Sequence, residues 1–207
     1  MSALARAIGR QLREPSGFGG WLTGCAMRLA NRRPTRLAIA ALGIRPGDVV
    51  VDLGCGTGDA VPALLAAARG GETHGVDHSE AMVRTAAHRH PDAIFHHSIF
   101  ARLPFADATI DRVLAANVAY FWTEASPILT ELARVMRPDG RLAIYVTDGA
   151  TLARVGLRAD ATRRSFRAGD LEQLLGPRAL VQPVRAGPGV RGFVATIEGR
   201  WLHARWD

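Results

Sequence analysis

Residues 49–60 read VVVDLGCGTGDA, and this stretch decides the fold class. Three consecutive valines, typical of a buried strand, lead into Asp52. Glycine then occupies every second position, at Gly54, Gly56 and Gly58. Because glycine tolerates backbone conformations that other residues avoid, such a loop lets the backbone approach a ligand closely. The stretch therefore predicts a strand that ends at a binding site.

The same strand–helix alternation continues along the chain. Strands are predicted over residues 48–53, 73–77, 93–97, 110–117, 141–147, 180–185 and 192–197, and helices over 60–69, 79–89, 127–136 and 169–175. Continuous apolar strands that alternate with helices indicate an α/β fold, with a Rossmann-like, doubly wound, mostly parallel seven-stranded sheet. Only a Gly-Pro-Gly turn separates the last two strands, so they should form an antiparallel C-terminal hairpin at one edge. Another turn is predicted at 138–140.

The first 46 residues precede this pattern and are predicted to form an N-terminal helical segment, with residues 47–207 as a single domain. Helical stretches over 6–12, 21–31 and 35–42 flank a glycine-rich loop that begins at Pro15. Its glycine hinges and aromatic Phe18 and Trp21 suit a lid over a ligand, with Gln11 and Ser16 as contacts. The alternative is a helix pair packed on the edge of the sheet.

Composition narrows the classes of partner. The 26 basic residues are all arginine, and they are scattered, so the net charge of +7 does not indicate nucleic-acid binding. No apolar run has the roughly 18 residues of a membrane span, so no membrane partner is expected. Two cysteines, Cys25 and Cys55, give no disulfide framework and suggest a cytoplasmic protein with reduced thiols. A monomer or a homodimer is expected.

Three ligands are conceivable for the glycine loop. The phosphate loop of nucleotide hydrolases needs a lysine, and the chain has none. The dinucleotide fingerprint needs a third glycine or alanine where this chain has Asp59, and an acid at the start of the following helix would face a pyrophosphate. A ligand without phosphate fits better.

S-adenosylmethionine is such a ligand. Asp52 at the end of its strand would hold the ammonium group, and the glycine backbone would approach the amino-acid portion. A second acid should meet the ribose hydroxyls at the end of the next strand, and Asp77 ends the segment THGVD. The offset is similar to the roughly 20 residues of comparable folds.

Four segments carry a resemblance to a known family: DLGCGTG, GVDHSEAMV, LPFADATIDRVLAANVAYFW and ELARVMRPDGRLAIYV. They resemble successive motifs of the class I S-adenosylmethionine-dependent methyltransferases, in the small ubiquinone/menaquinone-methyltransferase-like group. The resemblance spans about residues 44–147. It implies S-adenosyl-L-methionine as cofactor and S-adenosyl-L-homocysteine as product. No metal is expected, because the sequence has no metal-ligand spacing. The implied cofactor site comprises Asp52, Gly54, Cys55, Gly56, Thr57, Gly58, Asp77, His78, Met82, Ser98, Ile99, Phe100 and Asn117.

The adenine end of this site departs from the family pattern. The family usually has Gly-Asp-Ala after the third strand, with the aspartate near the adenine amino group. This chain has Ser98, Ile99 and Phe100 there, with no carboxylate. Backbone N–H groups and the two apolar side chains would then recognise the ring. Met82 would pack beside the adenosine, or else belong to the core of its helix.

The segment NVAYFW, residues 117–122, borders the transferred methyl group in the family. Asn117 and Tyr120 are the candidate catalytic residues. The substrate pocket would comprise Trp21, Tyr120, Phe121 and Trp122, with at least one of the aromatic residues in the core instead. A general base is needed only if the acceptor is protonated. Candidates for it are His78, His96, His97, Tyr120 and Asp148, and the sequence distinguishes none of them.

These features predict a methyltransferase that acts on a small, apolar or aromatic acceptor, with positioning as the main catalytic effect. The alternatives are a catalytically silent regulatory protein that binds S-adenosylmethionine, a methyltransferase for RNA or protein, and a nucleotide-dependent reductase.

Overall fold

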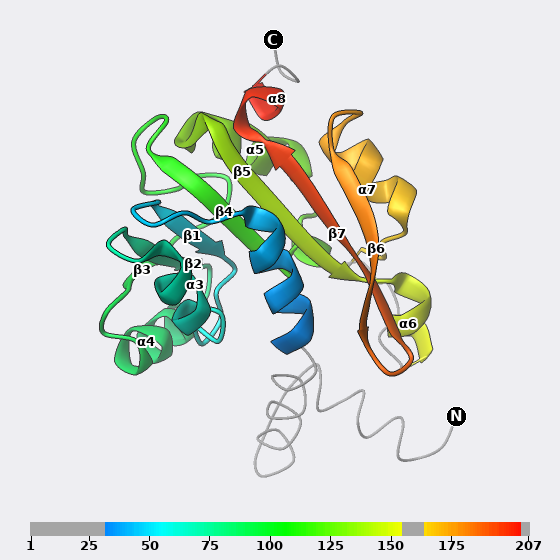
Figure 1. Cartoon of the computed structure of the whole chain (residues 1–207), viewed down its shortest axis with the longest axis horizontal. Coiled ribbons are helices and arrows are strands. Elements are labelled where there is room, and N and C mark those ends of the chain that lie inside the picture. Colours follow the sequence, from blue (N-terminus) through cyan, green and yellow to red (C-terminus); the bar gives the residue numbers. More distant parts are fainter. Residues whose placement is uncertain (1–31, 155–163, 204–207) are drawn as a thin grey trace.

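The sheet has seven strands in the order β3-β2-β1-β4-β5-β7-β6 (Figure 1). This computed structural model describes residues 32–154 and 164–203. The strands are β1 (Val50–Leu53), β2 (Thr73–Asp77), β3 (Ile94–His97), β4 (Ile110–Ala116), β5 (Met136–Thr147), β6 (Leu180–Gly187) and β7 (Val190–Glu198). The first five run parallel, whereas β7 pairs antiparallel with both β5 and β6. The predicted fold class and its C-terminal hairpin are confirmed.

Helices cover both faces of the sheet, because the strands bury side chains on both sides. The helices are one over 32–42, then α3 (Val61–Ala68), α4 (Glu80–Arg89), α5 (Ala125–Val135), α6 (Gly149–Arg154), α7 (Ala168–Leu175) and α8 (Gly199–His203), with the 3₁₀ turn η1 (Ala119–Phe121). In Figure 1 the helix over 32–42, drawn in blue, crosses one face. Leu42 and Leu64 pack with Val50 on that face, while Leu129 of α5 packs with Val51 on the other.

The predicted turn at 138–140 is wrong, because β5 runs through it. Ile110 pairs with Met136 and Arg112 with Arg141, so β5 carries three more residues than β4 between these pairs. The surplus forms a bulge-like irregularity. A side chain at Gly140 would come within 3.0 Å of the Asp111 carbonyl oxygen, which explains the glycine. Gly140, which suggested a turn, marks instead a place where two backbone segments approach closely.

Several helix ends follow from local sequence. Ser79 caps α4 by accepting a hydrogen bond from the N–H of Met82, as predicted. Gly43 follows the helix over 32–42 with φ of +60°, as expected of a C-terminal glycine. α5 begins at Ala125, two residues before the predicted start, with Pro127 still in its first turn, where its missing N–H breaks no hydrogen bond.

The predicted lid lies outside the described residues, together with Gln11, Ser16, Phe18 and Trp21. Within residues 32–154 and 164–203, no helix combines the length and the apolar character that crossing a membrane requires.

Candidate functional site

All three loop glycines have left-handed backbone conformations, with φ of +76° at Gly54, +53° at Gly56 and +79° at Gly58. Their surroundings differ. A side chain at Gly54 would collide with Val118, and one at Gly58 would come within 2.6 Å of His90. A side chain at Gly56 would meet none of the described residues within 4 Å. The glycine loop is therefore packed against other side chains at Gly54 and Gly58 and open at Gly56.

Asp52 lies at the end of β1, buried with 4% of its surface exposed. Burial, reinforced by the nearby carboxylates of Asp77 and Asp59, raises the pKa of Asp52 to about 7. In the described part of the chain its carboxylate accepts no hydrogen bond and has no cationic partner. A buried acid in this state favours a ligand that brings a positive charge.

Asp77 ends the neighbouring strand and ties it to the glycine loop. Its Oδ2 accepts a hydrogen bond of 2.9 Å from the N–H of Gly56, and its Oδ1 accepts one of 2.9 Å from the N–H of Ser79. His78, which is largely exposed, places Nδ1 3.4 Å from the same carboxylate. Because β1 and β2 are parallel and adjacent, Asp52 and Asp77 meet at the same edge of the sheet, as predicted.

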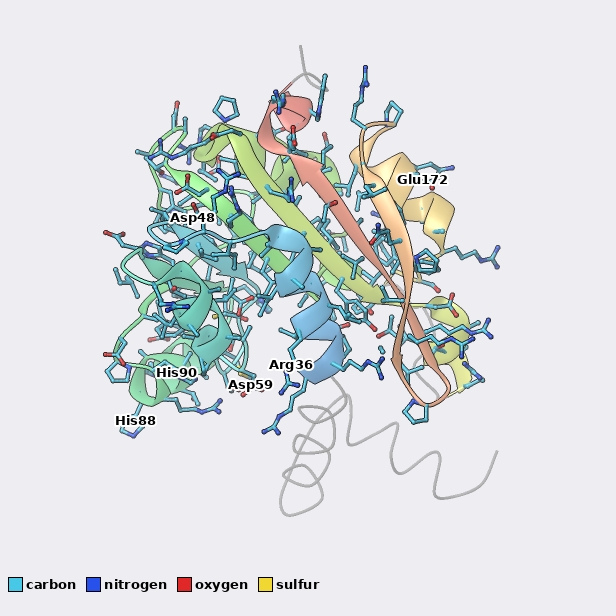
Figure 2. The ribbon with its side chains drawn as sticks, viewed as in Figure 1. Arg36, Asp48, Asp59, His88, His90 and Glu172 are labelled. Atoms are coloured by element: carbon cyan, nitrogen blue, oxygen red, sulfur yellow. The ribbon has the colours of Figure 1, made fainter. Side chains whose placement is uncertain are left out.

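Asp59 does not occupy the start of α3, contrary to the sequence prediction, because Ala60 is the N-cap of this helix. The first turn of α3 contains no acidic residue. Asp59 instead forms a 3.0 Å ion pair with Arg89 of α4, which also donates a 2.6 Å hydrogen bond to the carbonyl of Thr57. Figure 2 shows Asp59 and His90 beside α3 and α4. Arg89 was missed because a pair 30 residues apart leaves no local pattern.

Cys55 points away from the open side of the loop. Its sulfur packs against Gly75 of β2, where an added Cβ would lie only 2.9 Å from the sulfur. Burial raises the pKa of the Cys55 thiol well above its usual range, which makes it a packing residue and not a nucleophile.

The predicted adenine contacts lie on α4 and on the loop after β3. Met82 is 42% exposed and Ile99 is 64% exposed, so Met82 does not belong to the core of its helix. Phe100 is half-buried, and its ring centroid lies 6.3 Å from that of His78. Ser98 is engaged, since its N–H donates to the Asp77 carbonyl and its hydroxyl to the Arg102 carbonyl.

The segment after β4 separates into exposed and buried positions. Phe121 is 55% exposed, whereas Tyr120 is 5% and Trp122 is 1% exposed. Trp122 is therefore a core residue and not a pocket wall, a correction to the predicted substrate pocket. The Tyr120 hydroxyl donates a 3.1 Å hydrogen bond to Oδ1 of Asn117, which has an unusual φ of +58°. Tyr120 is thus buried and hydrogen-bonded to Asn117, so its predicted place in the wall of the substrate pocket is also corrected.

The remaining candidate bases have structural partners. His97 places Nε2 3.0 Å from the carbonyl of His78, and Asp148 accepts a 3.2 Å hydrogen bond from the N–H of Thr151 in α6. His96 places Nε2 3.2 Å from Nδ1 of His74. Burial and His74 lower the pKa of His96. This histidine pair was not predicted, because it joins two strands whose register the sequence does not reveal.

A doubly wound sheet with a left-handed glycine loop at the carboxyl end of its first strand defines the Rossmann-like class of domains. A family profile described as "Methyltransferase domain" matches residues 51–144. The demethylmenaquinone methyltransferase of Mycobacterium sp. (strain JLS) is 32% identical over 176 residues, which cover 83% of this chain and 75% of that relative. That of Beutenbergia cavernae is 38% identical over 53% of this chain, and the match spans only 45% of its own length.

A solved structure of an S-adenosylmethionine-dependent methyltransferase from Aquifex aeolicus superposes with a TM-score of 0.66. It is 22% identical, with 93% of this chain and 98% of that one covered, and so supports the fold. The chain belongs to the class I S-adenosylmethionine-dependent methyltransferases, in the group that includes the demethylmenaquinone enzymes.

Proposed function

We propose that this protein transfers the methyl group of S-adenosyl-L-methionine to a small apolar or aromatic acceptor. The observation that carries the proposal is the buried carboxylate of Asp52, which has no hydrogen-bond or cationic partner within residues 32–154 and 164–203, near the open backbone at Gly56. The cofactor presents an α-ammonium and a carboxylate together. The ammonium would neutralise the Asp52 carboxylate, and the cofactor's carboxylate would accept hydrogen bonds from backbone N–H groups of the loop.

The remaining cofactor contacts follow from the same edge of the sheet. Asp77 would accept hydrogen bonds from the ribose hydroxyls. Each of its carboxylate oxygens accepts one backbone hydrogen bond and retains a second lone pair. His78 and Met82 would flank the adenosine, and Ser98, Ile99 and Phe100 would line the adenine. Of the remaining loop residues, Gly54, Cys55, Thr57 and Gly58 shape the cradle.

When bound, the cofactor supplies an electrophilic methyl group on a positively charged sulfur. The protein's task is then to hold the acceptor in line with that bond, so positioning dominates. Asn117 lies at the carboxyl end of β4, where it would orient the methionine portion or the acceptor. Tyr120 acts through Asn117 as a positioning residue and not as a base. No metal is required, because the sulfonium already activates the methyl group.

An exposed aromatic side chain favours an apolar or aromatic acceptor. Phe121 is 55% exposed, is not among the proposed cofactor contacts, and lies in η1 directly after β4. This segment leaves the carboxyl end of a parallel strand, where ligands of such sheets bind. The two relatives described above are named for demethylmenaquinone, an apolar aromatic acceptor, whereas another relative is named for trans-aconitate, a small carboxylic acid. The free thiol of Cys55 suits a reducing compartment, and we place the reaction in the cytoplasm, with the protein as a monomer or homodimer.

Calorimetry tests the cofactor first. The purified protein should bind S-adenosylmethionine and S-adenosylhomocysteine, and not NADH. The Asp52→Asn variant should lose affinity for both adenosyl compounds by about tenfold or more, the cost of a lost charged hydrogen bond. Binding of NADH alone would overturn the proposal.

An acceptor screen with methyl-labelled cofactor then tests catalysis. It should include hydroquinones, phenols and small carboxylic acids, with RNA and protein mixtures in parallel. Labelling of a small aromatic molecule supports the proposal. Labelling of RNA or protein alone would replace the acceptor class, and tight cofactor binding without any transfer would favour the regulatory alternative.

A further inference from the structure

Residues 98–109 join β3 to β4, and the first half of this segment is a small turn. The N–H of Arg102 donates a 3.1 Å hydrogen bond to the carbonyl of Ile99, and the hydroxyl of Ser98 donates one of 2.6 Å to the carbonyl of Arg102. The N–H of Ser98 donates to the carbonyl of Asp77 at 3.1 Å. This turn carries all the adenine contacts that the loop would provide, so its position matters for the cofactor.

The second half of the segment is attached to the end of α5. The N–H groups of Ala108 and Thr109 donate hydrogen bonds of 2.9 Å to the carbonyls of Arg134 and Val135, and the side chain of Arg134 holds the residues before them. The guanidinium of Arg134 makes five hydrogen bonds, which equals its number of N–H groups. They reach the carbonyls of Leu103 (3.3 Å) and Phe105 (3.0 Å), the carboxylate of Asp107 (2.6 Å), and both carboxylate oxygens of Glu131 (2.9 and 2.7 Å). Every donor of Arg134 is therefore committed to the loop or to Glu131.

Glu131 completes the attachment from the same helix. Its Oε1 accepts a 2.6 Å hydrogen bond from the N–H of Leu103. Leu103 is therefore held at two points, its N–H by Glu131 and its carbonyl by Arg134. The Glu131 side chain is 12% exposed, and hydrogen bonding to Arg134 holds the pKa of this carboxyl below its usual range. Both partners stay ionised at neutral pH, and lysine, with three donors at one point, cannot reproduce the planar fork.

We propose that Arg134 and Glu131 are positioning residues for the adenine end of the cofactor site. Neither needs to touch the cofactor. They anchor the loop at Leu103, three residues beyond Phe100, and so fix the turn that faces the base. This inference rests on the proposed function.

The chemistry of the turn makes this anchoring important. Ser98, Ile99 and Phe100 include no carboxylate that could hold the adenine amino group. In the described structure the N–H groups of Ile99 and Phe100 donate no hydrogen bond, and both are therefore available to N1 of adenine, which is an acceptor. A backbone N–H cannot follow a displaced ligand as a flexible side chain can. Base recognition thus depends on where the loop is held.

The experiment compares S-adenosylhomocysteine with S-inosylhomocysteine by calorimetry. Hypoxanthine carries a hydrogen on N1, so a backbone N–H opposite N1 should make the wild type prefer the adenosyl compound by about tenfold, the value of one buried donor–acceptor mismatch. In Arg134→Lys, the affinity for S-adenosylhomocysteine should fall by about five- to twentyfold, and the preference should shrink to about twofold. Glu131→Gln should shift both quantities in the same direction, and provides the test if Arg134→Lys does not fold.

Arg112→Lys is the matched control. Arg112 forms a buried ion pair of 3.2 Å with Asp48 at the opposite end of the parallel strands. This variant should lose stability but keep both affinity and base preference. An unchanged preference in Arg134→Lys and Glu131→Gln would overturn the inference, even if their affinities fell. If the wild type bound neither compound, the proposed function would fail instead, which separates the two outcomes.

Discussion

The hydroxyl of Tyr120 donates a 3.1 Å hydrogen bond to Oδ1 of Asn117 and accepts the backbone N–H of Thr147. Asn117 has a left-handed backbone, which costs energy in a residue other than glycine and is typical of functional sites. The hydrogen bond also fixes which side of the Asn117 amide faces Tyr120. A buried phenol thus joins the ends of β4 and β5 and sets the orientation of the side chain nearest the proposed reaction.

Replacing Tyr120 with phenylalanine tests this role. The Thr147 N–H would lose its acceptor in a buried setting, so the free energy of unfolding should fall by about 1–3 kcal/mol. Transfer should slow by about tenfold because Asn117 is less well oriented, with affinity for S-adenosylhomocysteine changed by less than about twofold. Urea unfolding, calorimetry and single-turnover transfer measure the three quantities. If Tyr120 were the base, the variant would instead lose an ionisation from the pH–rate profile.

The raised pKa of Asp52 predicts an unusual pH dependence of stability. The native carboxyl keeps its proton up to about pH 7, whereas in the unfolded chain the pKa is 3.8. The unfolded state therefore binds fewer protons in this window, so the contribution of Asp52 to the free energy of unfolding falls as pH rises and is lost above about pH 7. The Asp52→Asn variant should be more stable than the wild type at pH 8 by roughly 2–4 kcal/mol, with a smaller difference at pH 5.

Urea unfolding of both proteins at several pH values measures this difference. Asp92→Asn, which changes an exposed aspartate, is the control and should unfold like the wild type. A stability difference for Asp52→Asn that did not grow with pH would contradict the assignment. Cofactor affinity gives a second readout, because the ammonium favours the ionised acid. Wild-type affinity should therefore rise as pH increases through about 7, the pKa of Asp52.

Local patterns in the sequence were enough to predict most of the fold. β1 was predicted over 48–53 and runs from Val50 to Leu53, because a run of valines before a glycine-rich turn identifies a buried strand. α6 and α8, with six and five residues, are too short for a periodic signal. Contacts between distant segments also escaped prediction: Arg134 of α5 holds the carbonyl of Phe105 in the loop after β3, and the two residues lie 29 positions apart.

The candidate site was predictable in its backbone and less so in its side chains. The glycine spacing and the two acids at strand ends follow from short-range sequence. Trp122 was assigned to the pocket because an aromatic run does not show which of its members faces inward. The turn η1 rotates successive side chains, which exposes Phe121 and buries its two neighbours. Burial of this kind depends on packing in the core that Tyr120 and Trp122 share with Phe166, a contact between distant segments that no local pattern encodes.

Asp77 and Asp59 lie close to the same loop and should differ sharply on substitution. Asp77→Ala should weaken binding of S-adenosylhomocysteine by roughly 1–3 kcal/mol, through loss of the ribose contacts and of the acceptor that holds the Gly56 N–H. Asp59→Ala removes an equal charge from an ion pair with Arg89 and should change affinity by less than about twofold. Calorimetry on both variants decides the matter. Equal losses would mean that general negative charge, and not the position of Asp77, attracts the cofactor.

A substitution at Gly56 can block the cofactor site sterically without destabilising the fold more than a matched substitution elsewhere. Alanine there must adopt φ of +53°, which costs about 1–2 kcal/mol, but its methyl group would have no atom of the described residues within 4 Å. Gly70→Ala imposes the same kind of strain at φ of +81°, also in open space, on the turn after α3. Both variants should therefore unfold at similar urea concentrations. Only Gly56→Ala should lose cofactor affinity, by about tenfold or more, because its methyl group projects into the cradle. If both variants bound S-adenosylhomocysteine like the wild type, the open side of the glycine loop would not be the cofactor-binding site.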